Sequence, residues 1–85
     1  MHYVYVLESE KNGHLYKGST SDLEARVKSH NGGKVRSTKG GRPWVLVYYE
    51  EYDDKTEARR RELFLKSGSG RKFLQSVLLK YRKVV

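Results

Sequence analysis

The fold is decided by residues 1–18, which read MHYVYVLESEKNGHLYKG. Asn12-Gly13 is a strong hairpin signal, because both residues tolerate the positive φ angles of a type I′ turn. That turn predicts three facing pairs: Lys11 with His14, Ser9 with Tyr16, and Leu7 with Gly18. Because side chains alternate along a strand, Tyr3, Tyr5 and Tyr16 then share one face of the sheet. Gly18 lies on that face and leaves open space, and two phenols beside a gap favour a site over a core.

The length and composition set the class of protein. A chain of 85 residues fits a single domain, residues 1–85, with a modest core. We expect no membrane segment, because no run reaches about 18 apolar residues and the N-terminus lacks a signal-peptide pattern. The absence of cysteine excludes disulfides and thiolate metal sites and favours a cytoplasmic location. The net charge of +8 indicates a polyanionic partner, which can be DNA, RNA or an anionic membrane, with charge-based solubility as the alternative.

The hydrophobic pattern predicts three strands. Residues 1–8 are apolar on both faces, which indicates a central strand, and residues 14–18 return antiparallel to it. Residues 44–49 (WVLVYY) form the third strand.

Capping signals and helical spacing predict three helices. Ser21 and Glu24 fit a capping box for a first helix that ends at an αL cap in Asn31-Gly32. Asp54 and Glu57 form a second box, opening a helix to about Lys66. Ser69 can cap a last helix, whose apolar positions are Phe73, Leu74, Val77, Leu78 and Tyr81. The order β-β-α-β-α-α implies an α/β (α+β) fold, with one three-stranded antiparallel sheet flanked by three helices.

Two charged residues lie at the borders of apolar helix stripes. Arg26 comes between Leu23 and His30, and Glu62 between Ala58 and Leu65. A helix repeats every 3.6 residues, so both charged side chains should lean toward the sheet, where an unpartnered charge is costly. A structural ion pair between Arg26 and Glu62, or snorkelling from the stripe edge, would also explain these positions.

The two tyrosine motifs, Tyr3-Val4-Tyr5 and Tyr16-Lys17-Gly18, are followed by other residues at ordered spacings. Arg26 follows Tyr16 by ten residues, and Glu62 ends the run ARRRE. Further stretches complete the set: residues 30–44 (HNGGKVRSTKGGRPW), 48–50 (YYE), 64–68 (FLKSG) and Gly70-Arg71. This ordered set resembles the GIY-YIG nuclease domain, in particular its small stand-alone members related to the N-terminal nuclease domain of the excinuclease C subunit. The resemblance covers essentially the whole chain.

The resemblance implies a set of site residues. Tyr5 matches the tyrosine that closes the family's first motif, Tyr16 the one that opens the second, Arg26 the helix arginine, Glu62 the metal-binding glutamate, and His30 a position where the family often has His or Tyr. The chain departs from the pattern at two positions: Tyr3 replaces the first motif's Gly, and Lys17 replaces the usual apolar centre of the second. Alternation places Lys17 on the face opposite Tyr16. A C-terminal Asn of larger members has no clear counterpart.

These residue types suit phosphodiester cleavage. One Mg²⁺ or Mn²⁺ ion on Glu62 could act as a Lewis acid while keeping most of its waters. Arg26 offers a planar donor fork for phosphate oxygens. A tyrosine has an unperturbed pKa near 10, so Tyr16 or Tyr5 could act as the base only beside positive charge. The alternatives are ordinary strand preference for the tyrosines and an interaction with the helix dipole for His30.

Four basic residues, Lys34, Arg36, Lys39 and Arg42, lie among glycines in residues 32–42. Such a composition suits contact along a phosphate chain, and a solvated connection is the alternative. No segment offers a recognition helix for reading bases, so strong sequence specificity is not expected.

The sequence therefore predicts a metal-dependent endonuclease of the GIY-YIG type that cuts DNA with structural selectivity or weak sequence preference. A non-catalytic nucleic-acid-binding module with the same fold is the main alternative. A protein-interaction or RNA-associated domain is a third reading, and a protein partner or a homodimer is compatible with all of them.

Overall fold

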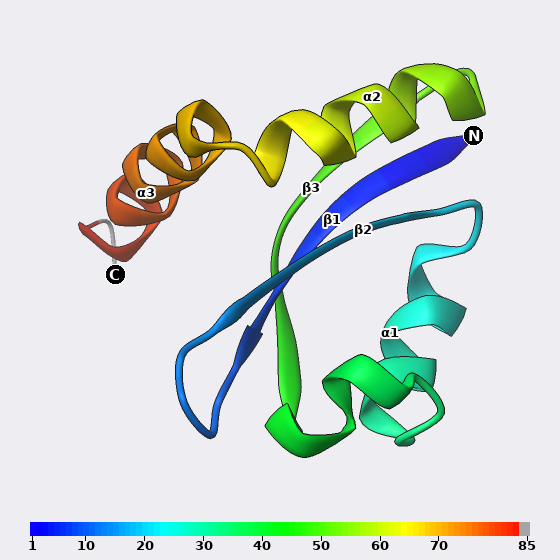
Figure 1. The fold of residues 1–85 in the computed structure, drawn as a ribbon, viewed down its shortest axis with the longest axis vertical. Helices are drawn as coiled ribbons and strands as arrows, with labels where there is room; N and C mark the ends of the chain where they lie inside the picture. The colour runs from blue at the N-terminus through cyan, green and yellow to red at the C-terminus, as the bar shows by residue number, and fades with distance from the viewer. Residues whose placement is uncertain (84–85) are drawn as a thin grey trace.

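A computed structural model describes the backbone of residues 1–83 and the side chains of residues 1–80 (Figure 1). The elements follow in the order β1 (His2–Ser9), β2 (Leu15–Thr20), α1 (Leu23–Asn31), the 3₁₀ helix η1 (Arg36–Gly41), β3 (Trp44–Tyr52), α2 (Lys55–Leu65) and α3 (Gly68–Lys83). The strands form one antiparallel sheet in the order β2-β1-β3. The predicted β-β-α-β-α-α order and α+β class are confirmed, with β1 as the central strand. Within the described residues, no helix is both long and apolar enough to cross a membrane.

The register of the first hairpin differs from the prediction by two residues. Tyr5 faces Gly18 and Leu7 faces Tyr16, and a four-residue loop, 10–13, replaces the two-residue turn. Ser9 closes this loop, because its Oγ accepts hydrogen bonds from the backbone N–H groups of Lys11 and Asn12. A shift of two residues keeps each side chain on its face. Tyr3, Tyr5 and Tyr16 therefore share a face as predicted.

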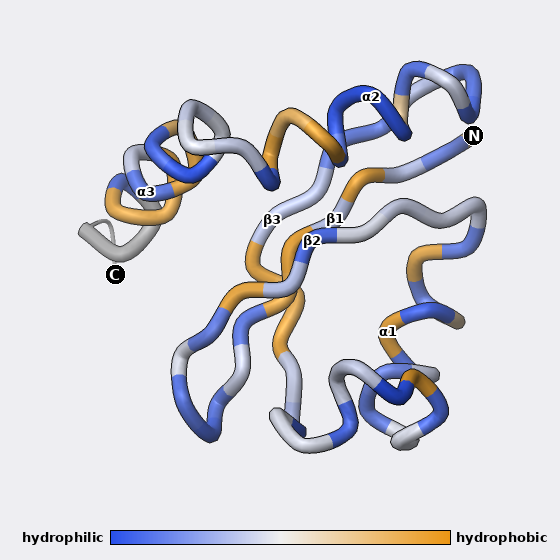
Figure 2. Tube along the Cα trace, viewed as in Figure 1, coloured by the Kyte–Doolittle hydropathy of each residue, from blue (hydrophilic) through white to orange (hydrophobic). Residues whose placement is uncertain are grey.

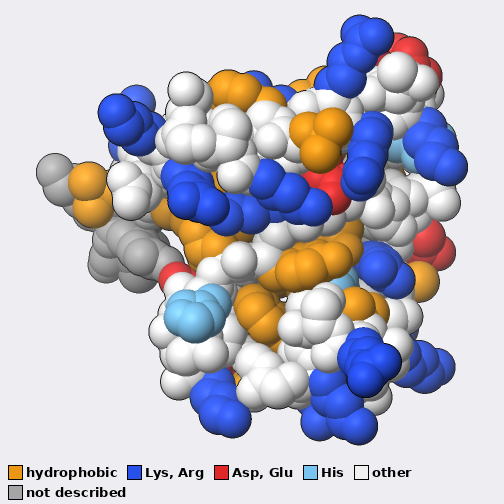
Figure 3. All heavy atoms as spheres, in the orientation of Figure 1, with side chains coloured by type: hydrophobic (Ala, Val, Ile, Leu, Met, Phe, Trp, Pro, Cys, Tyr) orange, Lys and Arg blue, Asp and Glu red, His pale blue; other side chains and the backbone are white. Residues whose placement is uncertain are grey.

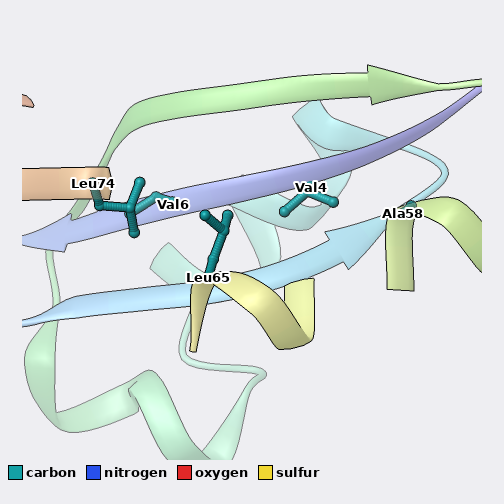
Figure 4. Packing of buried hydrophobic residues seen from close by; sticks show 5 residues of the cluster. All are labelled: Val4, Val6, Ala58, Leu65 and Leu74. Carbon is teal, nitrogen blue, oxygen red and sulfur yellow. The ribbon is translucent and has the colours of Figure 1, made fainter. Parts of the chain in front are cut away.

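The two faces of the sheet are covered by different helices. In Figure 1, α2 and α3 lie on one side of the strands, and α1 and η1 lie on the other. The α2 side buries the core of Val4, Val6, Ala58, Leu65 and Leu74 (Figure 4). The α1 side buries Tyr5, Leu7 and Trp44. Figure 2 shows the hydrophobic run of β1 between these two layers, while the hairpin tip is hydrophilic. Because β1 is buried on both faces, its alternate residues serve two separate cores.

Helix caps lie close to the predicted positions, with three differences. Asp22, not Ser21, caps α1 by accepting a hydrogen bond from the N–H of Ala25. The positive φ that ends this helix belongs to Gly33, at 76°, because Gly32 keeps helical angles. Ser67, not Ser69, accepts the N–H of Gly70 at the start of α3.

The remaining terminal signals were predicted correctly. Asp54 caps α2 as predicted, accepting from Glu57, and the C-cap of that helix is Lys66. Leu74 and Leu78 are buried, whereas the side chain of Tyr81 lies outside the described residues.

The junction of α2 and α3 requires a glycine at Gly70. A Cβ atom added there would overlap the backbone of α2 at the Phe64 carbonyl and the Leu65 Cα. Backbone atoms cannot rotate away, so the two helices would have to separate. Gly68, two residues earlier, has no heavy atom within 4 Å of the equivalent position.

We predict that Gly70→Ala lowers the free energy of unfolding by about 1–3 kcal/mol, the usual cost of overpacking. Gly68→Ala is the matched control and should stay within about 0.5 kcal/mol of the wild type. Urea unfolding followed by circular dichroism measures both. Equal midpoints for the two variants would contradict the close approach of α2 and α3.

Candidate active site

Tyr5 is at the centre of the polar cluster on the α1 side of the sheet. It comes from the central strand, and only 1% of its surface is exposed. Its phenol lies across Gly18 of β2, where an added Cβ would come 2.5 Å from the hydroxyl oxygen. The space predicted beside Gly18 is therefore filled by Tyr5. The glycine lets the hydroxyl of a central-strand residue reach across the neighbouring edge strand.

Two residues of α1 hold the Tyr5 hydroxyl. Its oxygen lies 2.9 Å from His30 Nε2 and 3.3 Å from Arg26 Nε, which donates to it. His30 Nδ1 lies 2.8 Å from Thr38 Oγ1, and the Thr38 hydroxyl donates to the Val35 carbonyl. Since that hydroxyl's proton is used there, Nδ1–H of His30 must be the donor to Thr38. Nε2 of the neutral ring is then an acceptor, so the Tyr5 O–H donates to it.

Burial and charge keep this cluster in one protonation state. Burial raises the pKa of Tyr5, against the opposing effect of the Arg26 hydrogen bond. Burial, followed by the charge of Arg26, lowers the pKa of His30 below 6.5. The hydrogen bond that Arg26 donates to Tyr5 is the main reason that the pKa of Arg26 rises, and Tyr16 adds to this rise. Near neutral pH the cluster therefore holds a protonated phenol, a neutral imidazole and one guanidinium cation.

Tyr16 packs against this cluster from β2. Its ring centroid lies 4.8 Å from that of His30 and 6.3 Å from that of Tyr5. The ring of Trp44 lies on the α1 side as well, 6.4 Å from Tyr16. Tyr16 is half-buried, whereas Tyr5 is enclosed. The two phenols therefore differ in access to a substrate.

Glu62 approaches β2 from the other face of the sheet. It belongs to α2, and 5% of its surface is exposed. Its Oε1 accepts hydrogen bonds from Ser19 Oγ at 2.7 Å and from Arg59 at 3.1 Å, and its Oε2 accepts from Lys66 Nζ at 2.8 Å. Burial acts to raise the pKa of Glu62, but the hydrogen bonds from Lys66 and Ser19 outweigh it, so the pKa lies below its usual value. The carboxylate is therefore ionised and accepts on both oxygens.

The cluster around Tyr5 and the carboxylate of Glu62 come together at the edge of the sheet formed by β2. A cavity of about 330 Å³ is lined by Arg26 from α1, Ser19 from β2 and Ala58 from α2. Ser19 holds Glu62, and the negative charge of Glu62 contributes to raising the pKa of Tyr5. Figure 3 views this edge, where Lys and Arg side chains surround acidic and hydrophobic atoms between the two helical layers. Among the described residues Glu62 forms ion pairs with Arg59 and Lys66, so the alternative of an Arg26–Glu62 pair does not hold.

The donor atoms fit a weakly ligated divalent ion. Within the described part of the chain no group of three His, Cys, Asp or Glu side chains could hold a metal by itself. Glu62 supplies one ionised carboxylate, next to the hydroxyl of Ser19. Mg²⁺ is often held by one or two carboxylates, with water and substrate phosphate completing its shell. Such an ion would compete with Lys66 and Arg59 for the Glu62 oxygens.

The four basic residues of the glycine-rich stretch lie away from this edge, around η1. Lys34, Arg36 and Lys39 are exposed. Arg42 folds back locally, with its Nε donating to the Lys39 carbonyl and its guanidinium close to Gly33. The same stretch carries Thr38, which holds His30, so it also supports the site.

Four partners of the site residues were not predicted. Arg59 and Lys66 lie three and four residues from Glu62, a helical spacing from which their ion pairs could have been inferred. Ser19 follows Gly18 and points to the opposite face, which alternation indicates. Thr38 has no periodic signal, because it lies in the glycine-rich stretch of residues 32–42, where the sequence shows neither helical spacing nor strand alternation.

We predict that the stability of the protein decreases as the pH falls below about 6.5, the ordinary pKa of histidine. Below this pH His30 binds a proton in the unfolded chain but stays neutral in the folded protein, because burial lowers its pKa there. The free energy of unfolding therefore falls with pH until the folded-state pKa of His30 is passed. His30→Gln removes this step. Glu50 and Glu62, whose pKa values lie below 4.5 in the folded protein, account for a separate loss at lower pH in both proteins.

Urea unfolding at a series of pH values measures the free energy of unfolding of the wild type and of His30→Gln. An equal decline of wild type and His30→Gln between pH 6.5 and 4.5 would show that His30 is not the group responsible.

Comparisons with known proteins agree with the resemblance. Residues 1–74 match the model of the GIY-YIG catalytic domain. A UPF0213 protein of Staphylococcus haemolyticus is 44% identical over 77 residues, which cover 89% of this chain and 93% of that protein. A UPF0213 protein of Clostridium perfringens is 41% identical over 78 residues, covering 91% of this chain and 83% of its own length.

A solved structure shows the same likeness. The solution NMR structure of a UPF0213 protein from Bacillus halodurans aligns with a TM-score of 0.56 at 42% identity, covering 93% of this chain and 84% of that one. Both the sequence and the arrangement of strands and helices thus point to one group of proteins. The chain belongs to the GIY-YIG catalytic domain family, whose members are nucleases that generally use divalent metal ions.

Proposed function

We propose that this protein is a metal-dependent endonuclease that hydrolyses DNA phosphodiester bonds, with structural selectivity or weak sequence preference. The observation that carries the proposal is the hydrogen bond from Arg26 to Tyr5, at the strand edge where α2 presents ionised Glu62. A guanidinium and a carboxylate at one edge can engage the two charged partners of this reaction, a phosphate and a divalent cation.

Arg26 binds and orients the phosphate. Its guanidinium lines the cavity at the β2 edge while Nε is held by the Tyr5 oxygen. The terminal nitrogens are the part of the fork suited to two phosphate oxygens. Tyr5 is the group that positions Arg26, because its own proton is committed to His30 and burial raises its pKa. This arrangement argues against Tyr5 as the base.

Tyr16 is the residue that we assign to the attacking water. It lies beside Tyr5 and His30 but is only half-buried, and its phenol adds to the rise in the pKa of Arg26. The guanidinium of Arg26 supplies the nearby positive charge that a tyrosine needs if it is to accept or orient a proton. The neutral ring of His30 packs against the ring of Tyr16, with a centroid distance of 4.8 Å.

Glu62 would hold the divalent ion, Mg²⁺ or Mn²⁺. When bound, such an ion supplies charge stabilisation for the phosphate and the leaving oxygen. Ser19 keeps the carboxylate at the β2 edge, and Lys66 and Arg59 neutralise it in the free protein. Substrate binding would draw these cations toward phosphate and leave the carboxylate oxygens available.

The wider charge favours nucleic acid over a small phosphoester as the substrate. The chain carries 18 Lys and Arg against 10 Asp and Glu. Lys34, Arg36, Lys39 and Arg42 surround η1, on the α1 side of the site, and we propose that they contact the DNA backbone there. A cytoplasmic location, where chromosomal DNA of bacteria is accessible, belongs to the same proposal, and RNA is the competing substrate.

We predict that Glu62→Gln and Tyr16→Phe each lower the cleavage rate by about 10²-fold or more, the typical size of a general acid–base or electrostatic contribution. Arg26→Lys keeps the charge but loses the fork, so it should also lower the rate. Tyr5→Phe should lower both the rate and the stability, because His30 Nε2 loses its partner. Cleavage of nicked, branched and plain duplex DNA with Mg²⁺ or Mn²⁺ measures the rates.

The same experiment tests the alternative of a binding module. A wild-type protein that binds these DNAs but cuts none of them with either metal would leave only the nucleic-acid-binding role. Competition between DNA and RNA of equal length then identifies the preferred nucleic acid. Full cleavage by Glu62→Gln would refute the assignment of the metal ligand.

A further inference from the structure

Lys17 is the residue of the second tyrosine motif that the proposed chemistry does not use. It faces Val6 across the β1–β2 pair, on the side of the sheet covered by α2 and α3. Ser19, which holds Glu62, lies two residues further along the same strand and on the same face. The family resemblance leads us to expect an apolar residue at position 17. Lys17 therefore places an unexpected positive charge near the carboxylate of Glu62, and this charge needs an explanation.

Three cations from three elements lie around Glu62, because Lys66 and Ser19 both hydrogen-bond to its carboxylate and Lys17 is two residues from Ser19 on the same face of β2. The start of α3 packs against the end of α2 at Gly70, which brings Arg71 to the same end of α2 as Lys66. Burial lowers the pKa of Lys17, and the positive charges of Arg71 and Lys66 lower it further. Lys17 belongs to the edge strand, Lys66 is the C-cap residue of α2, and Arg71 lies in the first turn of α3. Among these three cations, only Lys66 forms an ion pair with a carboxylate of the described residues, and its partner is Glu62. The group therefore carries an excess of positive charge.

The positive charges of Lys66 and Arg71 repel that of Lys17, and the partial burial of Lys17 reduces screening by water. Packing does not require a charge there, because an apolar residue could cover Val6 equally well. An anion that contacts all three side chains would remove the repulsion. Figure 3 shows the corresponding feature, a row of Lys and Arg side chains that runs from α3 toward acidic atoms at the middle of the face.

We propose that Lys17, Lys66 and Arg71 form a binding site for a backbone phosphate of duplex DNA, next to the phosphate that is cut. The site rests on the proposed nuclease function and names its second point of contact with the substrate. Lys66 connects this phosphate site to the candidate active site, since its Nζ lies 2.8 Å from Glu62 Oε2. A strand rises about 3.4 Å per residue, so Lys17 and Ser19 start about 7 Å apart along β2. DNA bound here follows the β2 edge from the cavity of Arg26 toward α3.

The test uses binding rather than cleavage. The double variant Lys17→Met/Arg71→Gln removes two charges and keeps the apolar stem of Lys17. Fluorescence anisotropy with a short fluorescein-labelled duplex, in EDTA and at several salt concentrations, gives the slope of log K against log salt. Loss of one phosphate contact should reduce the magnitude of this slope by about 0.9.

The matched control is Lys28→Gln/Arg60→Gln, which removes the same charge from exposed positions. Lys28 lines a groove with Tyr3, Leu46 and Tyr49, and Arg60 lies with Tyr52 and Phe64, both on the β3 side of the molecule. We expect the control to keep the wild-type slope. A control slope that falls as much as that of the double variant would show a general charge effect and overturn the proposal.

Stability separates a binding defect from misfolding. Relief of repulsion at Lys17 should keep the melting temperature of Lys17→Met at or above the wild-type value at low salt. Arg71→Gln changes an exposed position and repeats the binding test if the double variant loses structure. An unchanged slope in a folded variant would overturn the phosphate site.

Titration with inorganic phosphate, followed by amide chemical shifts, tests the site independently of any nuclease activity. Shifts that concentrate at Lys17, Lys66 and Arg71 support the proposal, and their absence there contradicts it. If the wild type cuts DNA while the three residues respond to neither probe, the nuclease proposal stands and the phosphate site fails. If the residues bind phosphate but no DNA is cut, the nuclease proposal fails and the anion site remains.

Discussion

The hydroxyl of Tyr5 is the constraint on which the α1 side of the molecule depends. A buried phenol on the central strand must have hydrogen-bond partners, because an unsatisfied polar group there would cost free energy. Arg26 and His30 supply them from positions four residues apart on one helix face, so α1 can pack in only one rotation. Thr38 then fixes the imidazole, which ties η1 to the same group. The residues that position the guanidinium are thus also the residues that determine how α1 and η1 lie on the sheet.

The second constraint is the buried carboxylate of Glu62, on the other face. A charge that is 95% covered needs compensation, and Ser19, Arg59 and Lys66 provide it. Side chains on opposite faces of a sheet are separated by the sheet itself, and they can meet only around an edge strand. β2 is that edge, and Gly18 allows Tyr5 to extend its hydroxyl over it. The position of the candidate site therefore follows from the strand order β2-β1-β3.

Sequence patterns predicted those features that depend on local rules. The element order, the central strand and the Asp54 cap follow from alternation, helical spacing and capping chemistry, and each was found in the structure. The predicted hairpin register is wrong because it places a two-residue turn at Asn12-Gly13, whereas Ser9 closes a four-residue loop by binding backbone N–H groups. The prediction that Tyr3, Tyr5 and Tyr16 share a face is still correct, because a register error of two residues leaves each side chain on the same face. Thr38 could not be predicted, since its role depends on the way that η1 folds back over His30.

Alternation along β2 explains how one short strand can serve both halves of the site. Tyr16 and Gly18 face α1, where the phenols, His30 and Arg26 gather, whereas Lys17 and Ser19 face α2, where Glu62 lies. An edge strand has one free side, so a substrate backbone following it can reach side chains from both faces. A core strand could not do this, since its neighbours cover both sides. The lysine at position 17 then has a physical reason to be charged: it extends the positive surface of the α2 side along the edge by which a polyanion would approach.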